Sequence, residues 1–295
     1  MKVAITPNDP HKIPVEDLNV TVERRRWRYR HAGSGPPLLL IHGLLGHSYS
    51  WRNVVPALAS QAEVYAVDLP GSGLSEPSAD GDGSLRAGAH GLFRFMDAAG
   101  LSRCDIMGTS YGGGLAMMLA ALAPQRVRRL VLVAPVNPWS AHGRILAPFL
   151  CSPVIAPLVL WLLPRLDMLH EFYFRRLFGD TQRIRPGTLE GYMKPLLRLG
   201  GLANTISVLR SWNRDLEQLR SILPHLPQVP TLLLWGSRDA AVNPASAREL
   251  KKYFRDCRLV MMEGIGHLPY EEAPEEFSLA VAEFLHQTAG TIGKS

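Results

Sequence analysis

Residues 104–123 read CDIMGTSYGGGLAMMLAALA, and this stretch decides the fold. A short, largely apolar run that is typical of a buried strand leads through Gly108-Thr109-Ser110-Tyr111-Gly112 into an apolar helix. A sharp turn between them would hold Ser110 in strained backbone geometry, and side chains at 108 and 112 would collide with neighbouring backbone. A serine hydroxyl is a poor nucleophile until a positioned base takes its proton. The stretch therefore predicts a nucleophilic Ser110 and a base elsewhere in the chain.

Similar apolar runs recur on both sides of this stretch, each followed by Gly, Pro or Asp and then by a helix-like segment. The predicted strands cover residues 37–41, 64–69, 104–108, 130–133, 231–235 and 259–262. The predicted helices cover residues 51–60, 84–99, 111–123, 244–254 and 274–287. This alternation is typical of βαβ units, so we predict an α/β fold with a mostly parallel sheet flanked by helices.

The alternation stops between about residues 137 and 225, a segment rich in Leu, Arg and Pro without a strand-like run. We expect a core made of residues 1–136 and 226–295, and an inserted helical cap over 137–225, here called the cap segment. Its residues 145–164 are uncharged and long enough for a membrane span, but four prolines argue against a straight one. We interpret them as apolar packing of the cap onto the core, with an acyl-chain pocket or lipid contact as the alternative.

The composition is that of a globular chain. It has 295 residues, of which 46% are hydrophobic and 20% are charged, which excludes a disordered tail, a collagen-like fibre and a disulfide-stapled miniprotein. Its three cysteines are far apart without C-x-x-C spacing, which predicts reduced thiols. The first residues are too short an apolar run for a signal peptide, so we expect a cytoplasmic protein.

The net charge of +6 is concentrated in the cap segment, which has 11 Arg and Lys against 6 Asp and Glu. A nucleic-acid-binding surface would need a basic stripe with stacking aromatic residues or a known motif, and neither is found, so no nucleic-acid partner is expected. The run from Arg24 to Arg30 comes nearest. There Trp27 and Tyr29 alternate with Arg28 and Arg30, which favours a strand of a surface hairpin.

One short acidic stretch, Asp80-Gly81-Asp82-Gly83, faintly resembles a calcium-binding loop. The later acidic ligands of such a loop are missing, so we interpret it as a loop before Ser84, which would cap the next helix. No metal site is therefore predicted.

Four further motifs, together with the serine turn, resemble the α/β-hydrolase fold superfamily over nearly the whole chain. They occur in the expected order, and the closest resemblance is to serine esterases and lipases with a helical cap. The motifs are His42-Gly43-Leu44-Leu45-Gly46, Asp68-Leu69-Pro70-Gly71-Ser72-Gly73-Leu74-Ser75, Trp235-Gly236-Ser237-Arg238-Asp239 and Gly264-Ile265-Gly266-His267-Leu268-Pro269.

The resemblance implies a catalytic triad of Ser110 as nucleophile, His267 as base and Asp239 as the acid that orients the imidazole. Asp239 could instead cap the following helix. Asp68 is the rival acid by residue type, but in similar sequences its segment is a structural turn.

By the same resemblance, the backbone N–H groups of Leu44 and Tyr111 would form the oxyanion hole. His42 would brace the loop, with proton transfer as its alternative role. The mechanism that the resemblance implies needs no cofactor and no metal.

The implied function is hydrolysis of carboxylic esters with apolar acyl groups through an acyl-enzyme, without a cofactor. Relatives that open epoxides or remove halides carry an aspartate where this chain has Ser110. Carbon–carbon bond hydrolases often have Trp directly after the catalytic histidine, where this chain has Leu268. Those hydrolases, thioesterases, lactonases and perhydrolases remain alternatives, as does a non-catalytic ligand receptor on the same scaffold. The expected partners are a small apolar ester and, through the cap segment, the surface of a membrane.

Overall fold

The computed structural model describes residues 13–78, 81–140, 143–144, 146–197 and 201–287. Its centre is an eight-stranded sheet with the strand order β1-β2-β4-β3-β5-β6-β7-β8. The first two strands form an antiparallel hairpin, β2 pairs antiparallel with β4, and all other neighbours are parallel. The strands are β1 Val15–Val22, β2 Arg25–Ala32, β3 Pro37–Ile41, β4 Glu63–Val67, β5 Cys104–Thr109, β6 Val127–Val133, β7 Thr231–Gly236 and β8 Cys257–Met262.

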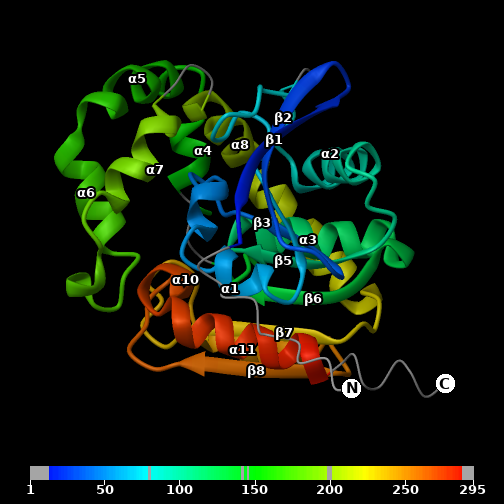
Figure 1. The fold of residues 1–295 in the computed structure, drawn as a ribbon. Coiled ribbons are helices and arrows are strands. Elements are labelled where there is room, and N and C mark those ends of the chain that lie inside the picture. Colours follow the sequence, from blue (N-terminus) through cyan, green and yellow to red (C-terminus); the bar gives the residue numbers. More distant parts are fainter. Residues whose placement is uncertain (1–12, 79–80, 141–142, 145, 198–200, 288–295) are drawn as a thin grey trace, which may run out of the picture.

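Both faces of the sheet are covered by helices because the central strands carry apolar side chains on both faces. In β3, Leu38 and Leu40 point to one face, and Leu39 and Ile41 point to the other. Helices α1 and α11 pack on the first face, whereas α2, α3 and α9 pack on the second (Figure 1). These helices and the short α10 are α1 Val55–Ala59, α2 Leu85–Ala98, α3 Tyr111–Leu122, α9 Ala245–Lys251, α10 Pro269–Glu272 and α11 Pro274–Gln287.

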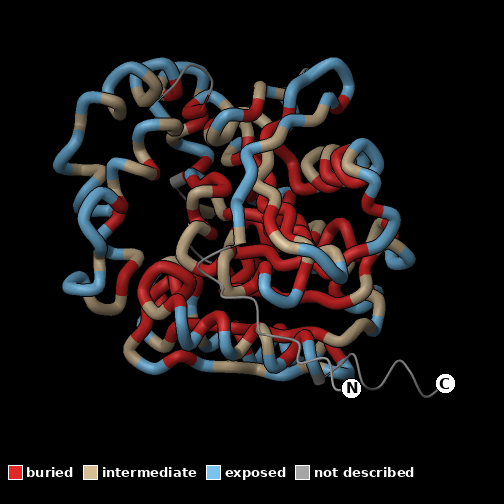
Figure 2. The backbone as a smooth tube through the Cα atoms, in the orientation of Figure 1, coloured by how far each residue is buried: buried red, intermediate tan, exposed pale blue. Residues whose placement is uncertain are grey.

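Helices occupy the cap segment, which enters the chain between β6 and β7. They gather beside the sheet in the upper left of Figure 1, and no strand occurs among the described residues of this segment. Their bounds are α4 Leu146–Leu150, α5 Ile155–Leu162, α6 Asp167–Arg175, α7 Thr188–Leu196 and α8 Gly201–Ile222. The tube in Figure 2 is buried along the sheet and largely exposed along α5 and α6.

The hairpin predicted around the arginine run is present, but one of its arginines is not on the surface. Glu23 and Arg24 form the turn with φ of 48° and 65°, and β2 follows. Arg28 is only 5% exposed, because its guanidinium pairs with Asp17 and with the buried carboxylate of Asp68. A buried acid therefore overrides the alternation that would have placed Arg28 in water.

Two local sequence predictions can be compared directly with the structure. Ser84 caps α2 by accepting a hydrogen bond from the backbone N–H of Ala87 at 3.2 Å, as predicted. Asp80 of the acidic loop lies outside the described residues. Cys104, Cys151 and Cys257 are all free thiols.

Candidate active site

The strand β5 runs directly into α3 through Ser110, whose φ of 53° and ψ of −118° lie outside the regions that non-glycine residues favour. Such strain persists only where the surroundings enforce it. A Cβ atom at Gly108 would overlap the backbone of Gly112, and one at Gly112 would overlap the backbone at Ile41. The two glycines therefore let the chain turn tightly enough to present the Ser110 hydroxyl, as the sequence predicts.

Two other loops, after β7 and β8, bring Asp239 and His267 together. His267 Nδ1 lies 2.7 Å from Asp239 Oδ2, and both side chains are buried. Asp239 Oδ1 also accepts the backbone N–H groups of Ala241 at 2.7 Å and Val242 at 2.9 Å. The tautomer in which Nδ1 of His267 donates to the carboxylate leaves Nε2 with a lone pair that can accept a proton.

The loop after β3 lies directly against the serine turn. Gly46 N–H donates to Gly43 O at 3.1 Å and Leu45 has a φ of 63°, so the loop forms a tight turn around Leu44. A Cβ atom at Gly43 would lie 3.2 Å from the Cβ of Ser110. The N–H of Tyr111 is at the first position of α3, where a helix offers no internal acceptor. Both N–H groups predicted for an oxyanion hole thus flank the candidate nucleophile.

A cavity of about 420 Å³ connects these parts. Ser110, His267 and Leu44 all line it, so the serine and the histidine face the same space. The cap segment supplies much of the remaining wall, with Leu163, Leu169, Tyr173, Phe174, Leu177 and Met193. Of the described residues that line the cavity, none is Lys, Arg, Asp or Glu. The lining of the cavity is therefore mainly apolar.

Comparison with known proteins agrees with this architecture. A family model described as the alpha/beta hydrolase fold matches residues 36–274. The chain belongs to the alpha/beta hydrolase fold family. The predicted fold class is thereby confirmed.

Among its curated relatives is "Haloalkane dehalogenase 2" of Mycobacterium bovis, which is 30% identical over 291 residues, or 96% of this chain and 99% of the relative. A "Pimeloyl-[acyl-carrier protein] methyl ester esterase" of Nitrosomonas europaea is 30% identical over 83% of this chain and 94% of that protein. A solved structure of a putative lipase from Acinetobacter baumannii superimposes with a TM-score of 0.81 at 26% identity, covering 94% of this chain and 93% of the lipase.

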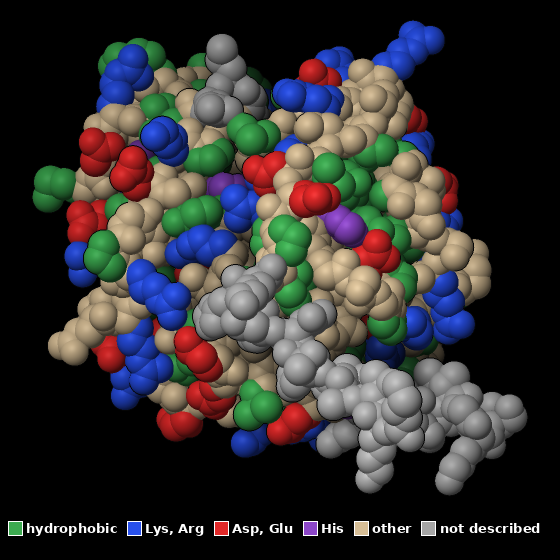
Figure 3. Space-filling view, viewed as in Figure 1, with side chains coloured by type: hydrophobic (Ala, Val, Ile, Leu, Met, Phe, Trp, Pro, Cys, Tyr) green, Lys and Arg blue, Asp and Glu red, His purple; other side chains and the backbone are tan. Residues whose placement is uncertain are grey.

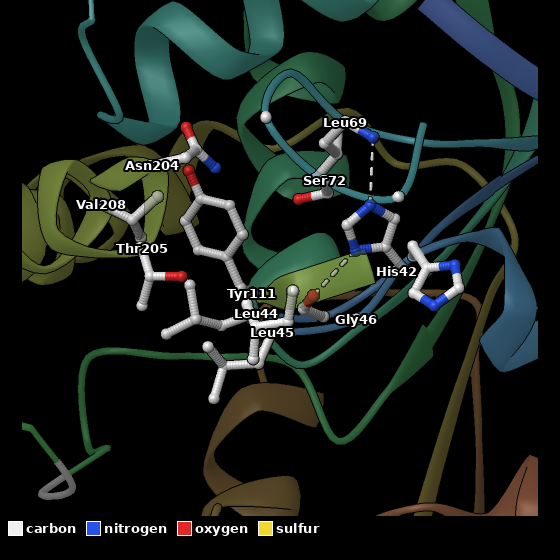
Figure 4. Close-up of a pocket in the computed structure, with 15 residues that line it drawn as sticks. His42, Leu44, Leu45, Gly46, Leu69, Ser72, Tyr111, Asn204, Thr205 and Val208 are labelled. Carbon is white, nitrogen blue, oxygen red and sulfur yellow. Dashed lines mark hydrogen bonds between the residues drawn. The ribbon is translucent and has the colours of Figure 1, made fainter. Parts of the chain in front are cut away.

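In this alpha/beta hydrolase, His42 and Asp68 both form hydrogen bonds that hold loops in place. His42 Nδ1 donates to Gly43 O at 2.8 Å and its Nε2 accepts the N–H of Leu69 at 3.0 Å (Figure 4). Burial lowers the pKa of His42 to about 4, so the ring is neutral and both nitrogens are engaged. This geometry fits a brace for the loop rather than a proton carrier. Asp68 accepts the N–H groups of Ser48 and Leu74, which fits a structural turn.

Tyr111 has separate tasks for its backbone and its side chain. The ring lines a small neighbouring pocket together with Asn204, Thr205 and Val208 of α8 (Figure 4). The hydroxyl donates to Gly83 O at 2.9 Å, and burial raises the pKa of Tyr111. The side chain therefore anchors α3, while only the backbone N–H remains available beside Ser110.

A buried acid that no sequence motif marks, Glu272, holds the loop that carries His267. Glu272, at the end of α10, accepts the N–H of Gly266 at 2.9 Å, next to His267. The same carboxylate accepts the N–H groups of Gly179 at 3.0 Å and Asp180 at 2.9 Å in the cap segment. His267 N–H itself donates to Leu177 O at 2.6 Å. Glu272 is thus a positioning residue that ties the histidine loop to the cap segment.

Its neighbour Glu271 forms a second buried link to the cap segment. Glu271 pairs with Arg52 and accepts the hydroxyl of Tyr192 at 2.8 Å, and Arg52 donates to Thr188 at the start of α7. Burial raises the pKa of Glu271, while Arg52 opposes that rise. No group of His, Cys, Asp and Glu among the described residues could hold a metal ion.

Proposed function

We propose that this alpha/beta hydrolase cleaves carboxylic esters with apolar acyl groups through an acyl-enzyme on Ser110. The observation that supports this most directly is the 2.7 Å hydrogen bond between Asp239 and His267 at a cavity that Ser110 also lines. In the proposed cycle, His267 takes the proton of Ser110 and later gives it to the leaving alcohol. The N–H groups of Leu44 and Tyr111 bind the oxygen of the tetrahedral intermediate.

The dehalogenase relative does not favour halide displacement here, because the nucleophile is a serine. Attack of a serine hydroxyl on an alkyl halide would leave an ether, which has no carbonyl carbon that water could attack. An acyl ester on the same oxygen is hydrolysed through a second tetrahedral intermediate. Turnover by Ser110 therefore requires an acyl group.

The lining of the cavity supports a neutral substrate. One structural neighbour is described as a 2-hydroxy-6-oxo-6-phenylhexa-2,4-dienoate hydrolase, whose substrate is by that name a carboxylate. No Lys or Arg among the described residues lines the present cavity, so a carboxylate would meet only histidine side chains there and no permanent positive charge. Neutral esters with medium or long acyl chains fit this lining better.

A series of 4-nitrophenyl esters of increasing chain length tests the proposal. We expect turnover that rises with acyl length, and fluorophosphonate labelling that mass spectrometry maps to Ser110. Ser110→Ala should lower kcat on the order of 10⁶-fold by analogy with another triad enzyme. Asp239→Asn should lower it about 10⁴-fold. Labelling at another serine, or full turnover by Ser110→Ala, would refute the assignment.

A further inference from the structure

The outer side of the cap segment carries an exposed apolar surface on α4, the residues after it, α5 and α6. We call this surface the cap face and define it by Phe149, Val154, Leu158, Trp161, Met168 and Phe172. Val154 is 82% exposed, Met168 86% and Trp161 59%. Figure 3 shows hydrophobic side chains on this side of the molecule, with charged side chains of both signs between them. Grouped apolar exposure of this kind marks an interaction surface more often than single exposed residues do.

The helix α5 is the clearest part of the cap face. Its sequence, IAPLVLWL, has no polar side chain, yet Ala156 is its only buried residue. A globular helix ordinarily turns an apolar stripe to the core and a polar stripe to water. Because α5 has no polar stripe, its outer side is suited to an apolar medium rather than to water.

Both signs of charge occur beside the cap face: Asp167 and Glu171 are exposed on α6, and two arginines lie against its aromatic rings. The guanidinium of Arg165 lies 4.6 Å from the ring centre of Trp161, and that of Arg176 lies 5.7 Å from the ring centre of Phe172. Aromatic rings with adjoining arginines suit the level of lipid headgroups, where the apolar stem is buried and the charge stays wet. The surplus of 11 Arg and Lys over 6 Asp and Glu in residues 137–225 favours anionic headgroups.

The same charge argues against a second copy of the chain on this surface. Two cap segments placed face to face would bring like charges together, which disfavours association. Among the described residues, no helix is both long and apolar enough to cross a bilayer. A surface contact with the bilayer remains.

The cap face also adjoins the cavity. In α6, Leu169, Tyr173 and Phe174 line the cavity, whereas Met168 and Phe172 are exposed on the same helix. Tyr173 does both, since it lines the cavity and is 59% exposed. The helix α6 therefore belongs both to the cap face and to the wall of the cavity.

We propose that the cap face binds the surface of an anionic lipid bilayer, with α5 and α6 lying flat at the level of the headgroups. Binding in this way buries apolar side chains at the acyl boundary and places Arg165 and Arg176 among the phosphates. The binding step does not depend on the proposed ester hydrolysis, and it can be measured without any turnover.

Flotation of the full chain with vesicles tests the proposal. We expect the protein to float with vesicles of phosphatidylcholine and phosphatidylglycerol, to float much less with phosphatidylcholine alone, and to dissociate partly as salt is raised. Val154→Asp combined with Met168→Asp should weaken partitioning by more than about tenfold. The matched control is Leu279→Asp, because Leu279 is 61% exposed on α11, outside the cap face, and should float like the wild type.

Trp161 provides a second, independent readout. It is the one tryptophan among the described residues that is exposed, so vesicles with brominated acyl chains should quench its fluorescence. Trp161→Phe should remove most of this quenching and still float.

Three results would overturn the proposal. They are failure of the wild type to float with anionic vesicles, unchanged flotation of the double aspartate variant, and a dimer in solution that this variant dissociates. The last result would assign the cap face to contact between copies.

Discussion

At the scale of single residues, the histidine loop is held by hydrogen bonds to two buried acids and to the cap segment. The His267 ring is hydrogen-bonded to the carboxylate of Asp239, and the backbone N–H of His267 donates to the carbonyl of Leu177. Glu272 adds the bond to Gly266. Both carboxylate oxygens of Glu272 accept hydrogen bonds, from three N–H groups in all. A glutamine has an NH₂ group in place of one oxygen, so at least one of these N–H groups would face another donor.

Glu272→Gln should therefore displace His267 and lower the rate of the acyl transfer that we propose. We expect kcat/KM for a short ester to fall about 10- to 100-fold, since small displacements at a reacting centre cost this much. Labelling of Ser110 by a small fluorophosphonate should slow in parallel. Glu263→Gln, the same exchange at an exposed glutamate near the loop, is the control. A lower Tm with unchanged labelling of Ser110 would show that Glu272 stabilises the fold without positioning His267.

How far the sequence could predict the site differs between these residues. Ser110, Asp239 and His267 each lie in a short motif with glycines, so local sequence was sufficient to identify the candidates and their loops. Glu271 and Glu272 are buried, whereas Glu275 and Glu276 a few residues later are exposed, and nothing in their local sequence separates the two pairs. Their burial depends on Gly179 and Tyr192, which lie far away in the chain.

At the scale of elements, α8 of the cap segment is joined to the start of α2 by a buried acid. Asp215 on α8 accepts the N–H of Leu85 at 3.1 Å. Leu85 is the first residue of α2, and the free N–H groups at the N-terminal end of a helix favour a negative charge. Asp215 is nevertheless 3% exposed, and burial raises its pKa to about 7. The hydrogen bond from Leu85 favours the ionised carboxylate, but burial outweighs it, so the folded chain holds Asp215 more readily as the neutral acid.

This shift makes stability depend on pH with a definite sign. Because the pKa of Asp215 is about 7 in the folded chain and 3.8 in a free side chain, its stabilising contribution is full below 3.8 and is lost as pH rises toward 7. Asp215→Asn keeps an acceptor for Leu85 and does not titrate. We expect its Tm, relative to wild type, to rise between pH 5 and pH 8 in thermal unfolding followed by circular dichroism.

The same exchange at the exposed Asp256 is the control and should leave the Tm difference constant with pH. A constant difference for Asp215→Asn as well would show that this carboxylate does not change its charge on folding.

The elements themselves were predictable to different degrees. Most strands and helices of the sheet layers were predicted from the spacing of apolar residues and from the Gly, Pro and Asp residues between them. The predicted range of α11 matches the observed one. In the cap segment the sequence predicted helices and no strand, but not the bounds of each helix. Pro153 lies between α4 and α5, and Pro164 lies in the short 3-10 helix after α5, whereas Pro148 and Pro157 lie in the first turns of α4 and α5.

At the scale of the whole molecule, the cap segment has only a small core of its own. One cluster of Cys151, Ala156 and Ile206 lies entirely within it. Leu216 and Leu219 of α8 belong to the core that α2 and α3 form with one face of the sheet. On the other face, Phe174, Phe178 and Tyr192 join the core of α1 and α11. The cap segment and the sheet layers therefore share their buried surface.

Shared cores predict that the chain unfolds as one unit. We expect a single calorimetric transition whose calorimetric and van 't Hoff enthalpies agree, with coincident urea curves from fluorescence and circular dichroism. A chain from which residues 137–225 are deleted should lack a cooperative transition. Two separated transitions in the full chain, or a folded deletion variant, would contradict this expectation.

The crossing of Gly179 and Gly266 limits how this scaffold can be recombined. A Cβ atom at either position would overlap the backbone of the other segment, so these two peptide segments meet without side chains between them. A chimera that receives its lid from a different hydrolase would need glycine on both sides of that crossing, together with an acid where Glu272 stands. Grafts spliced without this matched set should misplace the imidazole even when the transplanted lid is itself well folded.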